Sequence, residues 1–230
     1  MKVNTDYLKK VLYATMKATD CEVAICGGYL RDLDHGIESK DLDVFVLVPP
    51  VTPDTPVGAF GLSKLFLQID ADSDNIEDKK LALDTELRKQ GLVNEGLSDK
   101  PPRWYGNGKS SGSNMRDDVI GVQKYWDEEL DYVFMGADNW PQITENFDVS
   151  ICQIICCFED EKLNIYASDS YMAHKRGEGD ILRFYNIPTC DSHVARIKAK
   201  FGKVKGVYTN DGTLNLVGEL TEEGIVYHDK

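Results

Sequence analysis

Two short apolar runs near the N-terminus enclose a polar turn, and this pattern organises the first part of the chain. The runs are VAIC at 23–26 and VFVLV at 44–48, and the segment between them opens with the pair Gly27-Gly28. Short apolar runs bounded by turn residues are typical of buried strands, and glycine pairs end strands. The pattern therefore predicts a strand, a tight turn that opens a helix, and a second strand.

The same reading of apolar spacing predicts further elements along the chain. A proline-rich stretch at 49–58 predicts an extended linker, because proline fixes φ and lacks an N–H group. The alternation of apolar and polar residues at 207–227, around Asn210-Asp211-Gly212, predicts a β-hairpin. The predicted helices are 7–18, 59–69 and 76–90, and the remaining predicted strands are 130–135, 147–154 and 163–167.

Two acids stand at the start of the second apolar run. Asp41 and Asp43 project from one face of the predicted strand, because side chains alternate with period two. Two neighbouring carboxylates repel each other unless a hard cation such as Mg²⁺ lies between them. Gly27 and Gly28, which carry no Cβ, let a bulky anion come close to the N–H groups of the next helix. The sequence thus predicts metal-binding acids beside an anion site.

These residues carry a resemblance to a known family. The pattern Gly27-Gly28-x-x-Arg31-Asp32, followed after residues 33–40 by Asp41-x-Asp43, resembles the signature of polymerase-beta-type nucleotidyltransferases, in the variant of CCA-adding enzymes and poly(A) polymerases. The resemblance implies an α/β (α+β) fold, with a small mixed β-sheet flanked by helices. It also implies Mg²⁺-dependent (or Mn²⁺-dependent) transfer of a nucleoside monophosphate from an NTP to a hydroxyl group, with release of pyrophosphate.

The resemblance further implies a third carboxylate on a later strand. Asp148 is our candidate, because it is the one acid in the apolar run 147–154 and a buried unpaired charge is costly. In this interpretation Asp41, Asp43 and Asp148 are the catalytic and metal-binding residues, and Asp148 activates the acceptor hydroxyl. The alternative, an aspartate paired with a nearby lysine or arginine, stays open.

The remaining signature residues are assigned to the nucleotide. Gly27 and Gly28 are predicted to admit the triphosphate, and Arg31 to contact it through its planar guanidinium. Asp32 completes this predicted nucleotide-binding group, as a brace for Arg31 or for the start of the helix.

The charge of the chain limits its partners. With 26 basic and 39 acidic residues the formal net charge is −13, which argues against binding of long nucleic acid over the whole surface. The segment 174–205 has the opposite sign, with eight basic residues against three acids. Within it Lys175, Arg176 and Arg183 are predicted to meet the NTP phosphates or the acceptor. The alternative, a helix with solvated basic residues, stays open for these three and is favoured for the lysines at 200, 203 and 205.

The polar stretch 95–118 and the six cysteines each leave two interpretations open. Trp104 and Tyr105 are suited to stack on a base, and Lys109 and Arg116 to contact phosphate, but the stretch is equally compatible with an insertion that touches no substrate. The cysteines lie mostly in apolar runs without a CxxC pair, which predicts reduced, buried thiols. A zinc site that uses cysteines from 152–157 with a histidine is the alternative.

We predict a catalytic domain at 1–170 and an extension at 171–230 made of a basic helical segment and a β-hairpin. The N-terminus shows no signal-peptide apolar region and no stretch is apolar enough to cross a bilayer, so a cytoplasmic location without membrane contact is expected. The expected acceptor is an RNA or tRNA 3′ end, with a protein or small molecule as alternatives. The short, acidic chain is similar to compact stand-alone members of this family, some of them bacteriophage-encoded. The rival from another class is a non-catalytic nucleotide-binding or inhibitory protein of the same fold.

Overall fold

The computed structural model describes residues 2–39, 41–49, 76–94, 119–125, 129–185, 187, 191–210 and 213–228. The linker from residue 50, the predicted helix 59–69 and the stretch 95–118 lie outside the described residues. The helices are α1 (Thr5–Thr19), a helix over 76–89, α2 (Gly28–Asp34), α4 (Trp140–Glu145), α5 (Asp169–Lys175), α6 (Asp191–Phe201) and the 3-10 turn η1 (Ser150–Cys152). The strands are β1 (Glu22–Cys26), β2 (Leu42–Val48), β3 (Val119–Tyr125), β4 (Leu130–Gly136), β5 (Ile154–Glu159), β6 (Lys162–Ser168), β7 (Ile181–Phe184), β8 (Val204–Val207), β9 (Leu214–Thr221) and β10 (Gly224–Tyr227).

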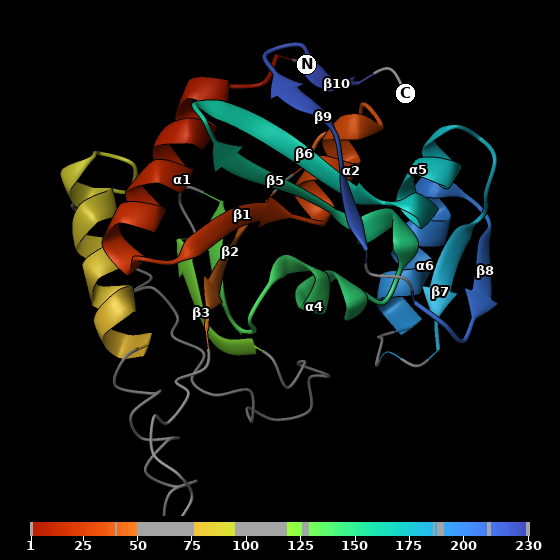
Figure 1. Ribbon diagram of the computed structural model, residues 1–230, viewed down its shortest axis with the longest axis horizontal. Helices are drawn as coiled ribbons and strands as arrows, with labels where there is room; N and C mark the ends of the chain where they lie inside the picture. Colours follow the sequence, from red (N-terminus) through yellow and green to blue (C-terminus); the bar gives the residue numbers. More distant parts are fainter. Residues whose placement is uncertain are drawn as a thin grey trace, which may run out of the picture.

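Among the described residues, eight strands form one mixed sheet in the order β10-β9-β6-β5-β1-β2-β4-β3. The pair β2–β4 is parallel, and the other neighbours are antiparallel. Helix α1 and the helix 76–89 lie at one side of the molecule, and α5, α6, β7 and β8 lie together at the other (Figure 1). This arrangement confirms the predicted mixed sheet flanked by helices, although the sheet is larger than predicted.

The core lies where the central strands meet α1 and α2. Ile25 of β1, and Val44 and Val46 of β2, are fully buried, as are Leu12 of α1 and Leu30 of α2. Burial of one such aliphatic side chain stabilises the fold by about 1.5–3 kcal/mol. The packing of Leu30 fixes α2, and with it the turn that precedes α2, against the sheet.

Helix α1 confirms the predicted helix at 7–18 and shows why it forms there. The side chain of Asn4 accepts a hydrogen bond from the backbone N–H of Tyr7, and Asp20 ends the helix in the left-handed conformation. Both features satisfy backbone groups that a helix end leaves without partners. The ammonium of Lys17 then binds Glu86 at 3.0 Å, which ties α1 to the helix 76–89. Among the described helices, none combines the length and apolar character that a bilayer crossing requires.

The predicted strand over 147–154 is wrong. Residues Ser150–Cys152 form the 3-10 turn η1, in which the N–H of Cys152 donates to the carbonyl of Val149 at 2.9 Å. The Ser150 hydroxyl accepts from the backbone N–H of Leu182 at 2.9 Å, so a distant segment competes for this stretch. The strand begins only at Ile154.

The predicted hairpin around residues 210–212 is also wrong. Strand β8 pairs with β7 in a separate two-stranded parallel sheet. The carboxamide of Asn210 instead hydrogen-bonds Gln153. The hairpin of this region joins β9 and β10, which pair at Thr221 and Gly224, and β9 adds to β6 in the main sheet. The predicted domain boundary at residue 170 therefore falls inside α5, and the chain later returns to the main sheet.

Candidate active site

The diglycine turn between β1 and α2 is the first component of the candidate site. Gly27 has φ 61° and ψ −109°, a conformation that a residue with a Cβ rarely adopts. Its carbonyl accepts from the N–H of Arg31 and its N–H donates to the carbonyl of Ile154, each at 3.0 Å. Gly28 has no such backbone constraint, but a Cβ placed there would lie 3.9 Å from Oδ2 of Asp43. The turn and the second acid of the Asp41-x-Asp43 pair are therefore neighbours, as the signature predicts.

Asp43 faces a second aspartate across the parallel pair of strands. In the β2–β4 register Asp43 lies opposite Asp131, which the sequence reasoning missed. Burial is the largest of the causes that together raise the pKa of Asp43 to about 6. The like charges of Asp131 and Asp41 act in the same direction, and Lys124 and Arg31 oppose them. A carboxylate in this position is destabilised until a cation joins it.

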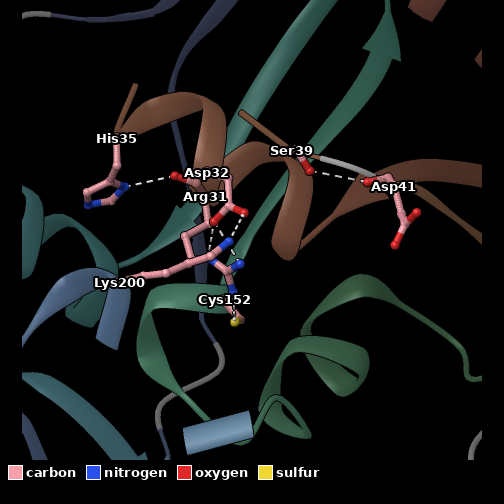
Figure 2. A network of polar contacts seen from close by, with 7 residues as sticks. All are labelled: Arg31, Asp32, His35, Ser39, Asp41, Cys152 and Lys200. Atoms are coloured by element: carbon pink, nitrogen blue, oxygen red, sulfur yellow. Dashed lines mark hydrogen bonds and ion pairs between the residues drawn. The ribbon is translucent and has the colours of Figure 1, made fainter. Parts of the chain in front are cut away.

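A cationic side chain already partners one of these acids. The ammonium of Lys124 on β3 forms an ion pair with Oδ2 of Asp131. Asp41 is exposed and precedes β2, and Figure 2 shows it to one side of the cluster around Arg31. Within the described ranges, no three histidine, cysteine, aspartate or glutamate side chains already lie close enough to hold a metal ion.

A repeated pattern in the sequence is the signal that would have found Asp131. Strand β2 reads LDVFV and strand β4 reads LDYVF, so each opens with a leucine followed by an aspartate. The structure aligns Leu42 with Leu130 and Asp43 with Asp131. Two adjacent parallel strands with the same opening bring their acids to the same end of the sheet.

Arg31 and Asp32 form a buried ion pair on α2. Nε of Arg31 donates to Oδ1 of Asp32 at 2.7 Å, and Nζ of Lys200 donates to Oδ2 at 2.8 Å (Figure 2). Burial alone would raise the pKa of Asp32, but these two hydrogen bonds outweigh it and hold that pKa below its usual value. The structure thus pairs Asp32 directly with Arg31. It also gives Lys200, expected to be solvated, a carboxylate partner.

Asp148 lies with helix α6. Its Oδ2 is 2.8 Å from Nδ1 of His193, and its backbone carbonyl accepts from Phe184 at 3.0 Å. The hydrogen bond to Asp148, with a second one to Cys152, raises the pKa of His193 to about 10. The charged groups with the largest influence on the pKa of Asp43 are Asp131, Lys124, Asp41 and Arg31.

The three basic candidates of the extension all have carboxylate partners. The guanidinium of Arg183 also lies over the ring of Tyr185, 5.1 Å from its centre. Lys175 reaches the C-terminal end of α2, where its ammonium also binds the carbonyl of Asp34 at 2.8 Å. The ion pairs are Lys175–Asp34 at 2.9 Å, Arg176–Glu178 at 2.6 Å and Arg183–Asp191 at 3.1 Å.

Comparison with known proteins gives a fold but no family by sequence. No protein-family model matches the chain, and no curated protein sequence matches it. Solved structures of a CCA-adding enzyme do match. The complex with ATP has a TM-score of 0.50 at 14% identity over 88% of this chain, and the complex with CTP has 0.46 at 13% over 86%. The chain spans about two fifths of those proteins, 41% and 39% of their lengths. At this identity the match to the ATP complex shows a shared mixed α/β fold and no more.

Proposed function

We propose that this chain is a Mg²⁺-dependent nucleotidyltransferase that transfers a nucleoside monophosphate from an NTP to a hydroxyl group and releases pyrophosphate. The observation that carries the proposal is the position of Asp43. It lies opposite Asp131 in the sheet and next to Gly28 of the turn. A metal-bound triphosphate requires carboxylates to hold the metal and, next to them, a backbone turn without side chains that admits the phosphates.

The donor set fits a hard divalent cation by its chemistry. Asp41, Asp43 and Asp131 offer only carboxylate oxygens, the ligands that Mg²⁺ prefers. Burial and then the charge of Asp131 raise the pKa of Asp43, and Lys124 offsets them only in part, which supports a cation at this position. We assign the metal to these three residues, with Asp131 in place of Asp148 as the third carboxylate. When bound, the cation would polarise the α-phosphate and stabilise the entering and leaving oxygens.

The protein side chains have separate roles in this proposal. Because Gly28 lacks a side chain, the space between the turn and Asp43 admits the phosphate chain. Arg31, held by Asp32, directs its guanidinium towards the same turn and supplies positive charge. The acceptor oxygen attacks the α-phosphorus as the bond to pyrophosphate breaks. The acceptor proton passes to Oδ1 of Asp131, the oxygen other than the one that Lys124 binds.

The acceptor that we propose first is an RNA 3′ end, tRNA included, because the matched structures are CCA-adding enzymes in complexes with ATP and CTP. A protein or a small molecule is the alternative acceptor. One observation favours the rival function, a nucleotide-binding protein without catalysis: Lys124 already neutralises Asp131. A lysine in that place supplies the charge of a cation without its Lewis acidity.

Pyrophosphate release tests the proposal directly. The protein is incubated with each labelled NTP, Mg²⁺ or Mn²⁺ and total tRNA, and pyrophosphate and labelled RNA are measured. We expect both products with the native chain and a loss of at least about a hundredfold with Asp43→Asn, as for loss of a metal ligand. Asp138→Asn, at an exposed acid after β4, is the matched control and should retain the activity. NTP binding without pyrophosphate, with any metal and acceptor tried, would favour the rival.

A further inference from the structure

Two exposed tyrosines lie side by side on the small sheet formed by β7 and β8. The ring centres of Tyr185 and Tyr208 are 5.4 Å apart, and the two residues are 53% and 80% exposed. Each directly follows the last residue of its strand, so both rings are at the same end of the sheet. A single exposed apolar residue needs no explanation, but neighbouring exposed rings are typical of a surface that binds a partner.

The two rings share one face of this sheet with a cation. Residues 183 and 206 lie opposite each other in the register, and side chains alternate along each strand. The guanidinium carbon of Arg183 is 5.1 Å from the ring centre of Tyr185. A Cβ at residue 206 would collide with that same ring, so only glycine leaves room for it there. We call this surface the aromatic face, and it consists of Arg183, Tyr185, Gly206 and Tyr208.

The charge of this part of the chain is opposite to that of the whole. The formal net charge of the chain is −13, but residues 181–208, which include β7, α6 and β8, contain a single acid, Asp191. Positive charge here attracts a polyanion to this region, while the acidic remainder of the surface repels it. Four of the basic residues are exposed, namely Arg196, Lys198, Lys203 and Lys205.

A short packed segment connects the aromatic face with the candidate active site. The ring of Phe147 packs edge-on against that of Phe45, with the centres 6.1 Å apart. Phe45 is two residues after Asp43 on β2, so the two side chains project from the same face of that strand. Val149, two residues after Phe147, forms a β-bridge with Arg183. A strand with its end in the active site can therefore continue past this segment onto the aromatic face.

We propose that the aromatic face binds single-stranded RNA, with bases stacked on Tyr185 and Tyr208 and phosphates near the exposed basic side chains. The inference rests on the proposed transfer reaction for the direction of the strand, because it places the 3′ end at the site of Asp43. Stacking on a ring is tolerant of sequence, since every base has a π face. The face should thus hold the acceptor strand without reading its sequence, and should bind a duplex less well, because paired bases already stack on each other.

Fluorescence anisotropy of a labelled single-stranded oligoribonucleotide, without NTP or divalent metal, tests this inference. Tyr208→Ala should weaken binding roughly tenfold, as expected for the loss of one stacking ring. Tyr208→Phe keeps the ring and should keep the affinity. Tyr13→Ala is the matched control, because Tyr13 is a 59% exposed tyrosine on α1, and it should bind RNA as the native chain does. Thermal unfolding of each variant verifies that the fold is intact.

Gly206→Ala provides a second test that leaves both tyrosines in place. Its methyl group would displace the ring of Tyr185, so the affinity for the single strand should fall severalfold. No binding of the single strand by the native chain, equal affinities for the native chain and Tyr208→Ala, or equally tight binding of a duplex of the same length would each overturn the proposal.

The binding assay and the pyrophosphate assay can fail separately. RNA binding that depends on Tyr208, without pyrophosphate release, would support the aromatic face and count against the transferase. Pyrophosphate release with another acceptor, without RNA binding, would support the transferase and overturn the present inference.

Discussion

The two glycines of the turn should respond differently to the same substitution. Alanine at residue 27 must adopt φ 61° and ψ −109°, and a non-glycine residue in such a conformation costs about 1–3 kcal/mol. The added methyl group finds space, since its nearest neighbour is the carbonyl of Cys152 at 3.9 Å. The cost of Gly27→Ala is therefore conformational rather than steric.

Alanine at residue 28 is free of this strain. Gly28 lies within α2, where alanine is preferred to glycine by up to about 1 kcal/mol. Its methyl group would lie 3.9 Å from Oδ2 of Asp43 and 3.8 Å from Nη2 of Arg31. That is the space assigned to the phosphate chain. Gly28→Ala should keep or slightly increase the stability and lower the transfer rate by roughly tenfold or more, because the phosphate can no longer approach the backbone.

Thermal unfolding and pyrophosphate release, measured on the same preparations, test this contrast. For a chain of this length about 1–3 kcal/mol corresponds to a fall in Tm of roughly 2–12 °C for Gly27→Ala. Gly36→Ala is a matched control, because Gly36 also has positive φ, 67°, but lies beyond the opposite end of α2. It should lower the Tm and retain transfer. Equal falls in Tm for residues 27 and 28, or unchanged transfer in Gly28→Ala, would refute the reasoning.

Three further predictions concern charged groups. The pKa of Asp43 is about 6 in the folded state, above its unfolded value, so native stability should fall as the pH rises from below 4 to above 6, by roughly 3 kcal/mol in total relative to Asp43→Asn. Mg²⁺ should restore this stability, and urea unfolding measured against pH tests both expectations. The raised pKa of His193 stabilises the fold below about pH 6.5, and this contribution should disappear as the pH rises towards 10. If the difference in unfolding free energy between the native protein and His193→Gln stayed constant over that range, the result would contradict the Asp148 contact. Lys124→Met should raise the pKa of Asp43 further and increase the stabilisation by Mg²⁺. The measurement is the shift in Tm on titration with the metal. A shift equal to that of the native protein would exclude competition between Lys124 and the metal.

The sequence was sufficient for the local unit of the site. The strand, glycine turn, helix and second strand at 22–48 follow from apolar runs and from glycine chemistry, which act over a few residues. The brace between Arg31 and Asp32 is also local, since the two residues are adjacent in the chain. Such features depend little on the rest of the fold, so pattern and residue type suffice to predict them.

Tertiary pairing decided the features that the sequence did not reveal. Asp131 meets Asp43 only because β2 and β4 are parallel and in register, and the chain between them has no turn signal that sets this register. Likewise, Ser150 accepts a hydrogen bond from Leu182, 32 residues away, which turns an apolar run into η1. The Asn-Asp-Gly sequence at 210–212 was a strong local hairpin signal, but β8 pairs with β7 and β9 with β6. Pairing with strands distant in sequence, rather than the local turn signal, set the partners of β8 and β9.

The last strand of the sheet also holds the glycine-turn helix in place. The hydroxyl of Tyr227 on β10 donates to Asp34 at the end of α2, at 2.7 Å, and Asp34 also accepts from Tyr171 at 2.7 Å. Near the other end of the chain, the N–H of Val3 donates to the carbonyl of Glu222 at 2.8 Å. A version of the protein shortened at residue 170 would thus lose the anchor of the helix that carries Arg31. Work on the nucleotide site should use the chain through at least Tyr227, with any affinity tag placed beyond it.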